Sequence, residues 1–377
     1  MRHWIRAAAW RSTEFPLSTH LPKLTVLALC VTAGFFVTRA VAVRHRADQV
    51  ADAETWYHRG TVSLQNGESD AAVAAFRRAV TARRDSIVYA TAYARALGDA
   101  GQLEAASSAL ERVRLMSPGD AHVNLALARL AVRRGLPTEA IRLYRNALYA
   151  TWPNEAERLD VRLELASFLI DEGRTADAAA ELVAAAAAAP VSIDALRSIG
   201  ALLLRAEDPA RALEVYRSVL TRAPADQRAL AGAAEAALRL GQYAAAREYY
   251  ARIPEGDAAT REGRAFADAV VTRDPLAPRL TLAQRRQRVA ANVAAVLERL
   301  EPCAAAADSP DRVEALTRTR ERLSAASRAA PRASRDELED YVAQTAAAAS
   351  LIDEVCGAPP PLHRALAAIA ARHGLAP

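Results

Sequence analysis

Residues Ala53–Val80 read AETWYHRGTVSLQNGESDAAVAAFRRAV, and this stretch decides the fold. Two small residues, Gly60 and Ala72, lie twelve positions apart, and a large one, Phe76, follows four positions later. Gly67 stands between them, where a turn would separate two helices. The pattern predicts two antiparallel helices that approach closely at the small residues, with the aromatic ring filling the space beside that contact.

The same pattern occurs six times in phase. The second small residue recurs at Ala72, Ala106, Ala140, Ala178, Ala212 and Ala246, the first at Gly60, Ala94, Ala128, Ala166, Gly200 and Ala234, and the large residue at Phe76, Leu110, Tyr144, Leu182, Tyr216 and Tyr250. The steps between units are 34, 34, 38, 34 and 34 residues, a period typical of repeat architectures. One helical pair cannot bury its apolar face alone, so the units are predicted to stack into a solenoid.

Two departures from the period are visible. Glu207 stands at the turn position that Gly occupies in the other five units. The 38-residue step comes from four extra residues, 155–158, after Trp152 and Pro153. They predict either an extended helix or a bulge at this junction, and a tolerated insertion is favoured over a functional elbow.

On these residues the chain resembles the tetratricopeptide repeat family, in six units over residues 53–257. The resemblance implies a right-handed superhelix whose concave groove, lined by the first helix of each unit, holds a partner protein or peptide. Projected onto this chain, it gives the groove residues Tyr57, Thr61, Arg95, Asp99, Arg129, Arg133, Asp171, Arg205 and Arg239. Some members clamp a terminal carboxylate with Lys and Asn, but no Lys stands at the matching positions here, so the clamp is not carried over.

The groove residues allow two interpretations. The arginines between Arg95 and Arg133 could bind an acidic or extended peptide through charge-assisted hydrogen bonds. Each of them could instead belong to a solvated helix face with ion pairs within the helix.

The N-terminal region predicts a membrane anchor. Residues 1–23 form a basic segment, and Leu24–Thr38 carries no charge. The run reaches about twenty residues, 24–43, if Arg39 extends its alkyl stem to the interface, which is the length of a transmembrane helix. An uncleaved signal anchor is the first interpretation; a signal peptide cleaved near Ala42 and a buried helix of a soluble domain are the alternatives.

The C-terminal third loses the 34-residue phase. Residues 258–274 predict a capping helix for the end of the solenoid, and Pro275–Arg279 predicts a linker. Residues 281–377 predict a small helical bundle, with Thr281 and Ser334 as N-caps of two of its helices. Cys303 and Cys356 are each expected just past the end of a helix. They could form a disulfide if the bundle is exported, and two buried free thiols are the alternative.

Charge excludes one class of partner. The net charge is +5, and residues 1–50 carry all of it with seven basic and two acidic side chains. The remainder is balanced, so no cationic surface for a nucleic-acid backbone is predicted. The seven His residues show no metal-ligand spacing, and no phosphate-binding or nucleophile motif occurs, so we predict no catalytic, cofactor or metal site.

These observations predict an all-α protein with a transmembrane helix, a repeat solenoid and a terminal bundle. The function predicted is a scaffold in a bacterial-type inner membrane, with its C-terminal part outside the cytoplasm, that serves envelope assembly, secretion or biogenesis. A cytoplasm-facing regulatory adaptor is the second hypothesis. An enzyme with its site in residues 281–377 is the third, and it predicts a polar pocket with perturbed ionisable groups there.

Overall fold

The computed structural model describes residues 17–188, 192–254, 256–357 and 361–375, and for residues 17–26 and 28 it describes the backbone alone. Across these ranges every regular element is helical, apart from one isolated bridge between Asp120 and Thr151. The all-α prediction is therefore confirmed. The chain divides into two compact units, residues 1–153 and 154–377, and the division falls inside the repeat region.

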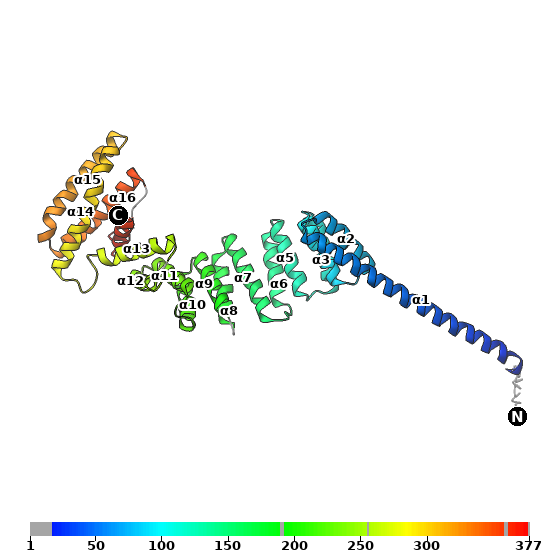
Figure 1. Ribbon diagram of the computed structural model, residues 1–377. Helices are drawn as coiled ribbons and strands as arrows, with labels where there is room; N and C mark the ends of the chain where they lie inside the picture. The colour runs from blue at the N-terminus through cyan, green and yellow to red at the C-terminus, as the bar shows by residue number, and fades with distance from the viewer. Residues whose placement is uncertain (1–16, 189–191, 255, 358–360, 376–377) are drawn as a thin grey trace, which may run out of the picture. The chain divides into compact units, whose positions relative to one another are not determined.

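Unit 1 (residues 1–153) consists of three helix pairs, each packed against the next (Figure 1). Its helices are α1 (Leu17–Gln65), α2 (Ser69–Ala82), α3 (Ile87–Asp99), α4 (Leu103–Met116), α5 (Ala121–Arg133) and α6 (Pro137–Tyr149). The first repeat begins within α1, at the buried Ala53.

Unit 2 (residues 154–377) contains three further pairs, a capping helix and a terminal bundle. The pairs are α7 (Glu155–Asp171) with α8 (Thr175–Ala187), α9 (Ile193–Arg205) with α10 (Pro209–Arg222), and α11 (Gln227–Arg239) with α12 (Tyr243–Ala251). The capping helix is α13 (Ala258–Arg273), and the bundle is α14 (Leu282–Ala306), α15 (Pro310–Ala329), the 3-10 turn η1 (Ala330–Arg332), α16 (Arg335–Cys356) and α17 (Pro361–Arg372).

Local chemistry starts the first helix of each repeat after the first. A side-chain oxygen of the residue before the helix accepts a hydrogen bond from the backbone N–H three residues on, which satisfies a donor that the helix itself leaves unpaired. These residues are Ser86, Asp120, Asn154, Ser192, Asp226 and Asp257. Their spacing follows the repeat and ends with Asp257, so α13 stands where the first helix of a seventh unit would stand.

The turn inside each repeat requires a left-handed backbone. Gly67, for example, has φ of 78°, and the four other turn glycines lie between 68° and 77°. Glu207, at the same position of the fifth repeat, adopts φ of 60° without the freedom of glycine. The repeat geometry therefore imposes this conformation even where the residue type opposes it.

The small and large positions pack as predicted. The second small residue of every unit is fully buried. Where the first small residue is Gly, an aromatic ring lies directly on its backbone: a Cβ added at Gly60 would lie 2.8 Å from the ring of Phe76, and one added at Gly200 would lie 2.7 Å from Cζ of Tyr216. Glycine is required at these two positions because any side chain would displace the ring.

The four extra residues extend a helix. α7 has 17 residues, whereas α3, α5, α9 and α11 have 13 each, and Asn154 caps its start. Of the two predicted forms, the extended helix is therefore confirmed. The boundary between the two compact units falls immediately before this extra turn.

The predicted anchor, residues 24–43, falls in the N-terminal half of α1. Residues 1–16 of the predicted basic segment and the side chains of Leu24, Thr25, Val26 and Ala28 lie outside what the structure describes. Among the side chains that it does describe, no helix combines the length and the apolar character needed to cross a membrane.

The terminal bundle shares its core with the capping helix. Val270 of α13, Val293 of α14, Leu338 of α16 and Ile369 of α17 belong to one buried cluster. At its edge the buried Asp274 carboxylate, 1% exposed, accepts a hydrogen bond from the Leu276 N–H at 2.9 Å and lies 3.1 Å from Nε2 of His373. The end of the chain is thereby joined to the loop that follows α13.

The predicted N-caps Thr281 and Ser334 are confirmed, each within a capping box. The end of the first bundle helix was predicted wrongly. α14 continues through Pro302 to Ala306, so Cys303 lies inside the helix, and Cys356 is the last residue of α16. A proline removes one backbone donor, and the buried Leu300 and Cys303 on either side keep the helix packed across that loss.

Candidate functional site

Unit 1 contains a hollow of about 580 Å³ between the first helices of its second and third repeats. α3 supplies Arg95 and Asp99, α5 supplies Arg129 and Arg133, and Leu110 of α4 lies among the lining residues. The helical period places Arg95 and Asp99, and likewise Arg129 and Arg133, one turn apart on a single face. We call this the arginine hollow.

The arginine hollow has an excess of positive charge. Its lining includes three guanidinium groups and His122, with Asp99 as the single carboxylate among the described lining residues. Arg95 is 75% exposed, and its Nε lies 3.9 Å from Asp99, a distance typical of a weak surface pair. The geometry therefore presents solvent-accessible guanidinium groups on an inner face of the repeats.

Three predicted groove arginines bridge neighbouring repeats. Nη2 of Arg133 donates to the carbonyl of Gly98 at 2.7 Å, and Nη1 of Arg239 donates to the carbonyl of Leu204 at 2.8 Å. In each case the last residue of one first helix reaches the C-terminal end of the previous one, where unpaired carbonyls favour a cation.

Arg205 makes the corresponding bridge to a side chain. Its Nη2 lies 2.8 Å from Oδ1 of Asp171, and its Nη1 donates to the Ser167 hydroxyl at 3.2 Å. Two of the predicted groove residues, Asp171 and Arg205, are thus paired with each other. Like Arg133 and Arg239, they contribute to the stacking of the repeats.

The structure brings only part of the predicted set together. Arg95, Asp99, Arg129 and Arg133 surround the arginine hollow. Tyr57 and Thr61 lie on α1, outside its lining: Tyr57 packs against Phe76 and Tyr89, with ring centroids 5.7 and 5.1 Å apart, and Thr61 Oγ1 donates to the Tyr57 carbonyl.

Unit 2 contains a larger hollow, of about 900 Å³, lined by α9, α11 and the start of α13. Tyr216 of α10 and Tyr250 of α12 also reach it, although both belong to second helices. We call it the tyrosine hollow. The sequence analysis assigned these tyrosines to packing alone; the available signal was a glycine in the next first helix, Gly232 opposite Tyr216 and Gly263 opposite Tyr250.

Both tyrosines keep their protons over the neutral range. Burial, and then the nearby Glu235 carboxylate, raise the pKa of Tyr216 to about 12. Burial, followed by the carboxylates of Glu235 and Asp257, also raises the pKa of Tyr250. Each side chain therefore offers an O–H donor near neutral pH.

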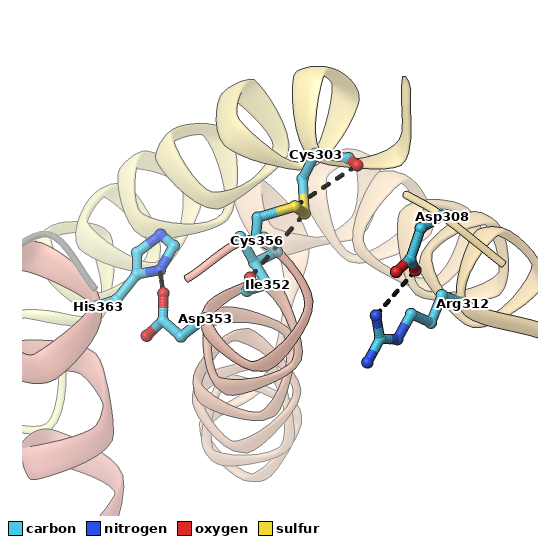
Figure 2. The surroundings of a disulfide bond; sticks show 7 residues. All are labelled: Cys303, Asp308, Arg312, Ile352, Asp353, Cys356 and His363. Carbon is cyan, nitrogen blue, oxygen red and sulfur yellow. Dashed lines mark hydrogen bonds and ion pairs between the residues drawn. A yellow bond between two sulfur atoms is a disulfide. The ribbon is translucent and has the colours of Figure 1, made fainter. Parts of the chain in front are cut away.

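Cys303 and Cys356 form a disulfide that joins α14 to the end of α16 (Figure 2). Their Cα atoms are 5.8 Å apart, and Cys303 is 5% exposed. The Cys303 sulfur also lies 3.9 Å from the carbonyl oxygen of Ile352. Cys30, in α1, is an exposed free cysteine.

A buried His–Asp pair lies near the disulfide (Figure 2). Nδ1 of the fully buried His363 side chain is 2.6 Å from Oδ1 of Asp353, and its Nε2 has no hydrogen-bond partner in the described part of the chain. Because Asp353 lies on α16 and His363 on α17, the pair fixes these two helices to each other.

The enzyme hypothesis predicted perturbed ionisable groups in residues 281–377. The carboxyls of Asp308 and Glu337 there have lowered pKa values. For Asp308 the main cause is the hydrogen bond from Arg312, and for Glu337 it is the hydrogen bond from the backbone N–H of Ser334. Both are exposed groups at helix starts. In the described residues no group of three His, Cys, Asp or Glu side chains could hold a metal ion.

Comparison with protein-family models gives matches along the repeat region. Models described as tetratricopeptide repeat match residues 53–86, then 91–156, 125–193 and 163–226, and finally 203–267. Together these windows span more than half of the 377 residues. No curated protein matches the chain.

Solved structures with a similar fold include three bacterial-type repeat proteins by title. "YrrB: a TPR protein with an unusual peptide-binding site" is 18% identical, with 47% of this chain and 90% of that chain covered and a TM-score of 0.37. The type IV pilus biogenesis factor PilW is 18% identical (53% and 91% covered, TM-score 0.39). A tetratricopeptide repeat protein from Parabacteroides merdae is 13% identical (64% and 90% covered, TM-score 0.40).

Proposed function

We propose, from the premise that this chain belongs to the tetratricopeptide repeat family, that it is a scaffold which binds an acidic segment of a partner protein in the arginine hollow. The observation that carries the proposal is the charge of this hollow. Three guanidinium groups and one carboxylate line it, although residues 51–377 as a whole are balanced.

The chemistry of guanidinium favours an acidic ligand. Its planar fork donates two parallel hydrogen bonds to a carboxylate, and Arg loses little hydration when it does so. Arg95 is the most accessible of the three, because its contact with Asp99 is long and leaves its donors in solvent. A segment with two or three acidic side chains would neutralise the excess charge of the hollow.

The test replaces Arg95, Arg129 and Arg133 together by Gln in the full chain. The probe is a labelled twelve-residue peptide with four Asp or Glu residues, and its Asn/Gln counterpart is the uncharged control. We expect the triple variant to bind the acidic peptide at least about ten-fold more weakly, because charged hydrogen bonds are removed. Fluorescence anisotropy gives the affinity, and circular dichroism checks that helix content is unchanged.

A matched variant separates the hollow from general charge. Arg84, Arg112 and Arg145 are exposed arginines of unit 1 outside the lining of the hollow, and their replacement by Gln removes the same charge. This control should retain the affinity of the native chain. Equal losses in both triple variants, or no loss in the first, would contradict the proposal.

We also propose that α1 tethers the scaffold to a membrane. The support is the uncharged run Leu24–Thr38 in the sequence and the exposure of its described apolar side chains, such as Leu29 at 68% and Phe36 at 64%. These side chains contact no other element of unit 1, so water or a lipid phase must solvate them. The Cys303–Cys356 disulfide supports an oxidising compartment for the C-terminal part.

The tether has its own test. Val31→Arg with Phe35→Arg should release the protein from membranes on alkaline carbonate extraction, because a charge at the centre of a span costs about 3 kcal/mol. Ala47→Arg with Ala51→Arg, in the same helix but outside the run, should remain bound. Alkaline phosphatase fused to the C-terminus should be active if this end is exported; an inactive fusion would favour the cytoplasm-facing adaptor.

The cellular process served by such a scaffold follows from its place. A protein tethered at the inner membrane, with its repeats outside the cytoplasm, would meet envelope components during assembly, secretion or biogenesis. In-membrane crosslinking at the arginine hollow, with identification of the captured protein, tests this part of the proposal.

A further inference from the structure

The tyrosine hollow has a feature that repeat packing does not require. Tyr216 and Tyr250 are 4% and 5% exposed, and their rings fill the space between neighbouring first helices. A leucine or phenylalanine would fill the same space, as Leu110, Leu182 and Phe76 do in other repeats. What the tyrosines add is a hydroxyl at the far end of each ring.

Two glycines let these hydroxyls reach the hollow. A Cβ added at Gly232 would lie 2.6 Å from the phenol oxygen of Tyr216, and one added at Gly263 would lie 2.3 Å from that of Tyr250. Any other residue at these positions would occupy the place of the hydroxyl. Both tyrosines, both glycines and the hollow they line belong to unit 2.

Neither phenol oxygen is hydrogen-bonded to another described residue of the chain. A polar group on a side chain that is nineteen-twentieths buried is normally paired, and here the open side of each hydroxyl is the hollow. The hollow, of about 900 Å³, lies within the size range of ligand sites. Two aligned O–H donors therefore face a space that water or a ligand must occupy.

The charges around the hollow limit the chemistry of that ligand. Asp194, Glu235 and Asp257 line it, together with Arg197 and Arg228. Arg197 is already held by Asp226, at 2.9 Å, and by Asp194. Because the Glu235 carboxylate acts on both tyrosines, an acidic ligand would be repelled at the point where the hydroxyls donate.

We infer that the tyrosine hollow is a second binding site, for an extended, uncharged peptide segment whose main-chain carbonyl oxygens accept hydrogen bonds from Tyr216 and Tyr250. Arg228, exposed and with no ion pair within the described chain, is a third donor at its rim. Carbonyl oxygens suit these donors because they accept without negative charge. This site differs in unit and in ligand from the arginine hollow, so either can fail without the other.

The test uses the full chain and an array of twelve-residue peptides built only from Ala, Gly, Ser, Thr, Asn, Gln and Val. Tyr216→Phe with Tyr250→Phe removes both hydroxyls and keeps both rings, so the repeats should remain folded, which thermal melting checks. Peptides that bind the native chain should bind this variant about ten-fold more weakly, the effect of two lost hydrogen bonds.

Two controls place the effect. Tyr149→Phe removes a hydroxyl from a side chain that is 89% exposed and should leave binding unchanged. Arg95→Gln with Arg129→Gln and Arg133→Gln should also leave the uncharged peptides bound. Equal affinity of the double tyrosine variant and the native chain would overturn the inference. So would failure of the native chain to bind any uncharged peptide, or loss of their binding in the arginine variant.

Discussion

Replacing Cys303 and Cys356 by Ser is expected to lower the free energy of unfolding of the terminal bundle by about 4 kcal/mol. The disulfide joins residues 53 positions apart and restricts the unfolded chain over that whole loop. In the folded state it holds the end of α16 against α14, beside the buried Leu300 and Ile352. Its loss therefore favours the unfolded bundle.

Thermal unfolding followed by circular dichroism measures this effect. The Cys30→Ser background removes the exposed free thiol, so that only the bridge responds to reductant. Reductant should lower the melting temperature of this protein and leave the Cys303→Ser, Cys356→Ser variant unchanged. Thiol labelling of the denatured protein gives the oxidation state. Full labelling without reductant, or an unchanged melting temperature after complete reduction, would contradict the prediction.

Gly200→Leu is expected to destabilise unit 2 by about 3 kcal/mol, through overpacking. Its Cβ would lie 2.7 Å from Cζ of Tyr216, whose ring is held on its other side by Gly232. The ring cannot move away, because Gly200 and Gly232 belong to first helices of successive repeats. Urea unfolding of the variant and the native chain measures the difference.

The sign of a smaller change makes this prediction sharper. In an open helix Gly→Ala stabilises by about 1 kcal/mol, because alanine is the better helix former. At Gly200 we expect Gly→Ala to destabilise instead, since the methyl group meets the ring. Gly119→Ala is the control, because nothing lies within 4 Å of its added Cβ, and it should change stability by less than about 0.5 kcal/mol. A neutral or stabilising Gly200→Ala would show that the ring can shift.

The sequence was sufficient for the parts of the fold that depend on local pattern. The six small and large positions, the turn glycines and the caps at Thr281 and Ser334 can each be recognised within a few residues. The helical extension at residues 155–158 was one of two forms that the spacing allowed. The passage of α14 through Pro302 was missed, because tertiary packing around Cys303 outweighs the local preference of proline.

The candidate sites were harder to predict, because each depends on contacts between repeats. A guanidinium on a first helix can face solvent or reach the carbonyl of the previous repeat, and only the structure shows that Arg133 and Arg239 do the latter. Likewise, Tyr216 reaches a hollow because Gly232 lacks a side chain, and these residues are sixteen positions apart. No local pattern indicates that pairing. The four residues of the arginine hollow were predictable because they share one face of adjacent helices.

The continuity of α1 has a mechanical consequence. Its 49 residues form one uninterrupted rod of about 74 Å, and the buried Ala53, where the first repeat begins, lies within it. A surface that grips residues 24–43 therefore grips the first repeat as well, since no swivel separates them. Turning the rod about its axis by a given angle turns the α1–α2 pair by the same angle.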